Sequence, residues 1–165
     1  MIQRIQTVLL LLVALCMALI LAYPIWFEQS ADASKGIIMT ALKMEVVDLG
    51  GTPMDGTDDT IIESRGTWYI AALAIIASLV AILSIFQFKN RLNQMKLGAL
   101  NALIMAATLG ICFYKVYQFE EMINPAAGNF SLGFFLSAVA MILNILSNRF
   151  IRKDEKLVKS VDRIR

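Results

Sequence analysis

Side chains that could do acid–base or metal chemistry are concentrated in residues 28–66, which hold eight of the thirteen acidic residues. Four of these acids follow one another closely, and carboxylate oxygens are the ligands that calcium prefers: Asp55, Asp58, Asp59 and Glu63. The twelve-residue calcium loop requires glycine at its sixth position, and that position counted from Asp55 is Thr60. The pattern therefore favours a solvated acidic loop over a metal site.

The chain contains no histidine, which removes the usual general base and histidine-bearing haem and zinc sites. Its two cysteines, Cys16 and Cys112, lie in apolar segments, where the helical rise separates their depths by roughly 9 Å, too far for a disulfide. We therefore expect no catalytic residue, no cofactor and no metal, and a protein that is not an enzyme. A lipid-modifying enzyme that uses Asp55, Asp58 and Asp59 is a third-ranked alternative.

Apolar residues make up 58% of the chain and charged residues only 17%, a composition typical of a membrane protein. A spanning helix needs roughly 20 apolar residues. Four segments meet that length and are predicted spans: 8–27, 68–88, 97–119 and 130–147. We therefore predict an all-α membrane protein, an antiparallel four-helix transmembrane bundle that forms a single domain over residues 1–165. The first span is interpreted as retained, because it exceeds the roughly 15 residues of a signal-peptide core.

Basic residues fall mainly on one side of the predicted bundle. Eleven of the fifteen lysines and arginines lie near the N-terminus, in the 89–96 connection or in the 149–165 tail. Ten of the thirteen acids lie on the other side. Because lysine and arginine collect on the cytoplasmic side of short loops, both termini are predicted to be cytoplasmic.

Residues 28–66 also contain a strand pattern. Apolar residues alternate over 38–46, the turn-forming sequence Gly-Gly-Thr-Pro follows at 50–53, and 60–63 is a possible return strand. We therefore predict a small β-hairpin cap on the bundle.

Small residues at four-residue spacing are the predicted helix-packing positions, because they let backbones approach closely in lipid. They are Ala14, Ala18, Ala22, Gly98, Ala102, Ala106 and Gly110. A hydrogen bond between Asn101 and Asn144 is predicted to contribute roughly 1 kcal/mol and to fix the register of two spans. Packing within the chain is favoured over dimerisation.

The basic tail, residues 149–165, has apolar residues at helical spacing and is predicted to form a cytoplasmic amphipathic C-terminal helix. Its candidate contacts with a membrane surface or a partner protein are Arg152, Lys153, Lys156, Lys159 and Arg163. The pattern leaves open whether this helix binds the membrane or a protein.

Two end segments carry a family resemblance: MIQRIQT at 1–7 and KDEKLVKSVDRIR at 153–165. They resemble the ends of an uncharacterised bacterial family of four-span inner-membrane proteins, classed as a domain of unknown function. The similarity covers the whole chain in length, span order and loop sizes. It implies a location in the bacterial inner membrane with 28–66 in the periplasm, and it brings no activity, cofactor or catalytic residue.

We therefore expect a non-enzymatic accessory or scaffold subunit of a membrane assembly, with the lipid bilayer and a membrane-protein partner as its contacts. Nucleic acid is not an expected partner, because the basic tail is short and lacks interleaved aromatic residues. The alternative is a small solute or ion transporter or channel, in which a polar path would be lined by Asn101, Asn144, Gln87 and Lys115.

Overall fold

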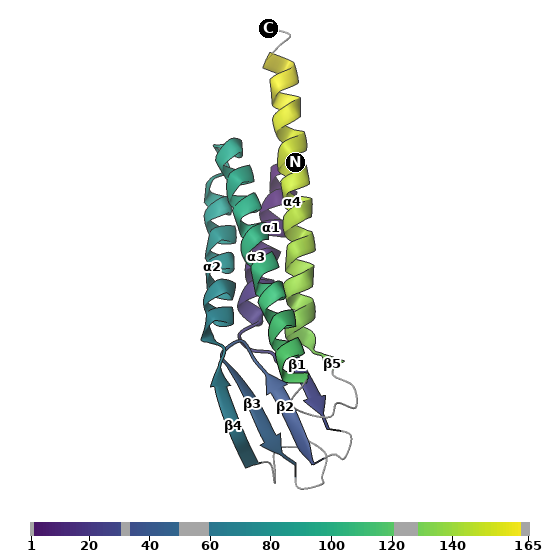
Figure 1. Ribbon diagram of the computed structural model, residues 1–165. Helices are drawn as coiled ribbons and strands as arrows, with labels where there is room; N and C mark the ends of the chain where they lie inside the picture. Colours follow the sequence, from purple (N-terminus) through teal and green to yellow (C-terminus); the bar gives the residue numbers. More distant parts are fainter. Residues whose placement is uncertain (1, 31–33, 50–59, 121–128, 163–165) are drawn as a thin grey trace.

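The computed structural model describes residues 2–30, 34–49, 60–120 and 129–162. Four helices stand on one end of a five-stranded antiparallel sheet (Figure 1). The helices are α1 (Ile2–Leu19), α2 (Trp68–Phe86), α3 (Arg91–Glu120) and α4 (Leu132–Asp162). The strands are β1 (Trp26–Gln29), β2 (Lys35–Met39), β3 (Lys43–Asp48), β4 (Thr60–Gly66) and β5 (Asn129–Phe130).

Each helix packs against two neighbours: α1 and α3 both lie along α2 and α4. The chain runs toward the sheet in α1 and α3 and away from it in α2 and α4 (Figure 1). Small and flexible residues fill the centre, where Met17, Ala74, Met105 and Ala140 are completely buried. This packing is close enough for the Ser78 hydroxyl on α2 to donate to the Ala14 carbonyl on α1, at 3.0 Å.

Three helical stretches are long and apolar enough to cross a membrane: Trp68–Phe86, Arg91–Gln118 and Leu132–Ser160. Only about a third of each stretch, or less, is buried inside the chain. The outward surface carries large apolar side chains such as Leu79, Leu103 and Ile142. Surfaces of this kind are stable where lipid surrounds them.

The predicted first span does not extend as far as expected. Its apolar helix, Ile5–Leu19, is shorter than the other three, and the chain enters β1 at Trp26. Pro24 explains the change, because proline lacks a backbone N–H and disfavours helical geometry at the preceding residue, here Tyr23. The apolar residues that follow, Ile25 and Trp26, are buried at the junction of helices and sheet.

The predicted all-α fold with a β-hairpin cap is wrong, because the sheet has five antiparallel strands in the order β4-β3-β2-β1-β5. The single strand expected over 38–46 is two strands, β2 and β3, joined by a tight turn. Thr40 makes this turn: its backbone N–H and its hydroxyl both donate to the Lys43 carbonyl at 2.8 Å. A threonine hydroxyl that bonds the backbone in this way competes with the strand ladder.

The helices and the sheet share one hydrophobic core. Ile37, Met39 and Met44 from β2 and β3 belong to the same buried cluster as Met17 and Met105 from α1 and α3. Backbone bonds reinforce the junction: the Thr67 N–H donates to the Leu42 carbonyl at 2.9 Å and the Gly133 N–H to the Pro24 carbonyl, also at 2.9 Å. The sheet is therefore held rigidly against the helices.

The fourth span and the tail form one helix, where the sequence predicted two. α4 runs without interruption from Leu132 to Asp162 and passes beyond the ends of the other three helices (Figure 1). No glycine or proline occurs between residues 134 and 162 to stop it.

Candidate functional site

Polar side chains with buried atoms occur on α3 and α4 in the part of these helices far from the sheet. We define the polar layer as Gly98 and Asn101 on α3 with Asn144, Ser147 and Asn148 on α4. The Asn144 side-chain amide donates to the Gly98 carbonyl at 2.8 Å. Gly98 lies directly under the Asn148 side chain, since a Cβ there would come within 2.6 Å of Asn148 Cγ. The missing side chain of Gly98 therefore makes room for an amide group.

Several polar atoms of this layer have no hydrogen-bond partner within the described part of the chain. They are both amide atoms of Asn101, Oδ1 of Asn144 and of Asn148, and Oγ of Ser147. A buried polar group without a partner costs about 1–3 kcal/mol, so such atoms normally pair with water or a polar ligand. The layer thus offers amide and hydroxyl groups, all uncharged, inside an otherwise apolar set of helices.

The predicted hydrogen bond between Asn101 and Asn144 does not form, because Asn144 donates to the Gly98 backbone instead. Ser147 and Asn148 were not among the residues predicted from the sequence. Their spacing from Asn144, three and four residues, places all three on one helix face and could have identified them.

The small-residue positions do not form continuous stripes. Ala14 and Gly98 are buried and Ala102 is half-buried, whereas Ala18, Ala22, Ala106 and Gly110 are exposed. A step of four residues turns the helix by about 40° more than a full circle, so a strict four-residue pattern drifts off the packed face. Gly110 makes this plain, because a Cβ there would meet no atom within 4 Å.

The polar path proposed for a transporter is not brought together. Gln87 is exposed at the end of α2. The Lys115 amine donates to Gln118 Oε1 at 3.1 Å on its own helix, near the sheet. Neither residue belongs to the polar layer with Asn101 and Asn144.

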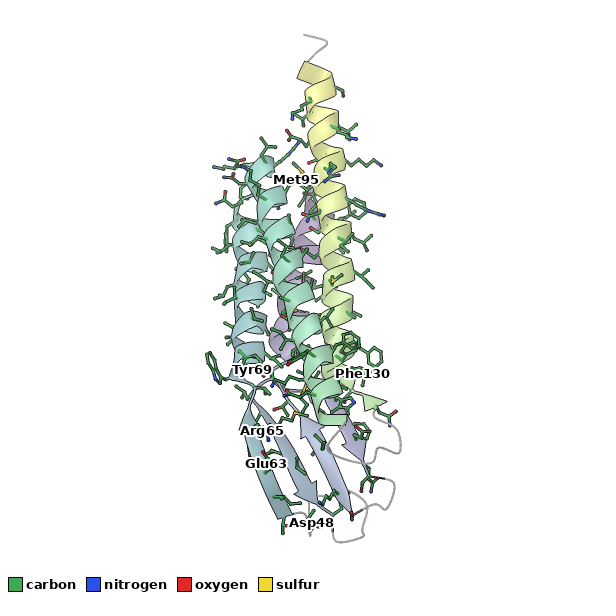
Figure 2. The ribbon with its side chains drawn as sticks, in the orientation of Figure 1. Asp48, Glu63, Arg65, Tyr69, Met95 and Phe130 are labelled. Atoms are coloured by element: carbon green, nitrogen blue, oxygen red, sulfur yellow. The ribbon has the colours of Figure 1, made fainter. Side chains whose placement is uncertain are left out.

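The acidic segment gives no metal-binding geometry in its described part. Asp48 ends β3 exposed, and Glu63 on β4 pairs with Arg65 at 2.6 Å (Figure 2). Asp55, Asp58 and Asp59 lie outside the described residues. Among the residues that are described, no three histidine, cysteine, aspartate or glutamate side chains group in a way that could hold a metal ion.

The far end of α4 is fixed by a two-point contact with the start of α3. Arg91 Nη2 lies 3.1 Å from Asp154 Oδ2, and Arg91 Nη1 donates to the Asp154 carbonyl at 3.1 Å. The two side chains are only 20% and 16% exposed. Asp154 interrupts the apolar pattern of the tail, and this contact explains why: it anchors α4 just before the helix projects.

Beyond this anchor α4 extends past the ends of the other described helices (Figure 1), although Glu155, Lys156 and Lys159 still line a groove with the start of α3. We call residues 155–162 the projecting segment. Its side chains include Leu157 at 49% exposure, with Lys156, Val158 and Lys159 also exposed, and Arg152 and Lys153 are exposed just before it. Arg163 lies outside the described residues.

Comparison with known families decides the classification of the chain. The model of a domain of unknown function, DUF4293, matches residues 2–164. The chain belongs to the DUF4293 family. No curated protein matches it. The polar layer and the projecting segment therefore both lie within the DUF4293 domain, and the predicted membership of an uncharacterised family is confirmed.

Proposed function

We propose that the protein is a non-enzymatic accessory or scaffold subunit of a bacterial inner-membrane assembly, and that the projecting segment is its contact with a cytoplasmic partner protein. The observation that carries this proposal is the continuous helix α4, which passes beyond the other helices and is held in that position by the Arg91–Asp154 contact.

The charge distribution supports the proposed orientation. The segment 89–96 and the residues from 149 onward carry most of the basic residues, while the segment 28–66, which contains most of the strands, carries eight of the thirteen acids. Basic residues next to membrane-spanning helices favour the cytoplasmic side. We therefore place both termini in the cytoplasm and the sheet in the periplasm.

The direction of the projecting segment favours a protein over the membrane surface as its contact. A basic amphipathic helix that binds lipid lies in the plane of the interface. The projecting segment instead continues the axis of α4 beyond the ends of the other helices (Figure 1), so in the proposed orientation it points away from the bilayer. Lys153 and Leu157 share the helix face opposite Glu155, so the contact we propose is an acidic protein surface with a small apolar centre.

Site-specific photo-crosslinking tests this proposal. A photo-reactive residue at position 157 in the full chain, in its native membrane, is expected to give one protein adduct of defined mass. Lys153→Glu should abolish that adduct, because it places like charges across the contact. Lys89→Glu, which makes the same change away from this face, should leave it intact. An adduct of equal yield from the apolar position 103, or one that survives Lys153→Glu, would reject the proposal.

A small-solute pathway is the second candidate, favoured by the unpartnered polar atoms of the polar layer. Flux of solute into liposomes that contain only this protein, reduced by Asn101→Ala together with Asn144→Ala, would favour transport over the scaffold role.

A further inference from the structure

A basic groove runs between the start of α3 and the end of α4. It has a volume of about 420 Å³, and its α3 wall contains Leu92, Met95, Lys96 and Ala99. Met95 lies at this end of α3, where it faces α4 (Figure 2). The α4 wall is charged and consists of Arg152, Glu155, Lys156 and Lys159. We infer that this groove binds the headgroup phosphate of an anionic phospholipid.

The charge of the groove fits a phosphate. Four basic side chains line it against one acid, Glu155, whose carboxylate lies 3.2 Å from the Lys159 amine. Lys96, Arg152 and Lys156 have no ion-pair partner among the described residues. Basic pockets of this kind between membrane helices, on the cytoplasmic side, are typical binding sites for anionic lipid headgroups.

The position of the groove fits a lipid better than a free ion. It lies where the apolar part of α3 begins, and its lining includes the apolar side chains of Leu92 and Met95. Toward the sheet, the same helix faces continue with exposed Leu103 on α3 and Ile145 on α4. A phospholipid whose phosphate is held by the basic residues would therefore place its acyl chains along an apolar surface.

A neighbouring hollow shows why the charge matters. This second hollow, about 560 Å³, is lined by Phe88, Lys89, Arg91 and Val158 among others. Its Arg91 is already paired with Asp154, which leaves Lys89 as the one basic side chain of this hollow without an ion pair among the described residues. The groove between α3 and α4 has three such basic side chains, Lys96, Arg152 and Lys156, and is therefore the better anion site.

The inference rests on the membrane placement proposed above and is independent of any protein partner. Native mass spectrometry of the full chain in mild detergent tests it, with phosphatidylglycerol as the probe and phosphatidylcholine as the neutral comparison. We expect phosphatidylglycerol to remain bound under conditions that remove phosphatidylcholine. Lys96→Gln combined with Lys156→Gln should weaken its binding by roughly 30-fold, since each basic residue near a phosphate contributes about fivefold.

The matched control is Lys89→Gln combined with Lys153→Gln, which removes the same charge from the same two regions outside the groove. It should change phosphatidylglycerol binding by less than about twofold. Equal weakening by the two pairs would overturn the inference, as would inorganic phosphate displacing the lipid at equal concentration. Melting temperatures of both variants should match that of the parent, which separates lost lipid binding from lost folding. Membrane insertion is tested separately by the labelling experiment below.

Discussion

Trp26→Ala is expected to lower the free energy of unfolding by about 3–5 kcal/mol, the usual range for removing a large buried aromatic side chain. Trp26 is only 1% exposed and lies on β1 opposite both Met39 of β2 and Phe130 of β5. Its ring belongs to the core that joins the helices to the sheet. The loss would be a large share of the 5–15 kcal/mol that stabilises a typical domain. Denaturant titration in detergent micelles measures it.

The other tryptophan provides the control. Trp68 begins α2 and is 68% exposed, with an edge contact to Tyr69 at 6.2 Å. Trp68→Ala should cost less than about 1 kcal/mol, because little of its surface is buried within the chain. Equal effects of the two substitutions would mean that the core at the junction of sheet and helices is not packed as described.

Gly133→Ala is expected to destabilise the protein by about 1–3 kcal/mol, the usual cost of an overpacked site. A Cβ at this position would lie 2.7 Å from the Pro24 carbonyl oxygen and 2.9 Å from that of Tyr23. Both are backbone atoms and cannot rotate away. The clash also opposes the hydrogen bond from the Gly133 N–H to Pro24, so the start of α4 must shift away from the chain between α1 and β1.

Gly110→Ala is the matched control, since a Cβ there meets no atom within 4 Å. Alanine favours a helix over glycine by up to about 1 kcal/mol, so this change should leave stability equal or higher. The same titration in micelles compares the two variants. A loss at Gly110 as large as that at Gly133 would contradict the packing around α4.

The sequence predicts the long apolar helices well and the junction between the helices and the sheet poorly. The start of α2 at Trp68 is correct, because a long apolar run bounded by polar residues has few alternatives. β1 was missed, because Trp26 and Phe27 extend an apolar run that also suits a helix, and only Pro24 marks its end. β5 is two residues long and forms only through its pairing with β1. Such tertiary pairing leaves no local pattern in the sequence.

In the candidate site, too, the sequence predicts which residues are important but not which atoms they contact. Asn101 and Asn144 were recognised as buried polar residues in apolar helices, and both are buried. Their partners were not predicted, because the Asn144 bond to the Gly98 carbonyl depends on helix rotation and depth. The basic groove depends on α4 continuing past residue 147 beside the start of α3, and the sequence divided that helix in two.

The proposals share one geometric requirement. The projecting segment must reach a cytoplasmic partner, and the basic groove must lie at the inner surface of the membrane. Both follow only if the helices cross the bilayer with the sheet on the opposite side from the end of α4. This arrangement is the central claim about the protein.

Cysteine labelling in spheroplasts tests this claim most directly. In a background with Cys16→Ala and Cys112→Ala, single cysteines are placed at the sheet by Thr60→Cys and on the projecting segment by Ser160→Cys. Both positions are exposed. A membrane-impermeant maleimide should label Thr60→Cys in intact spheroplasts and Ser160→Cys only after lysis. Labelling of Ser160→Cys in intact spheroplasts, or protection of Thr60→Cys until lysis, would contradict the account.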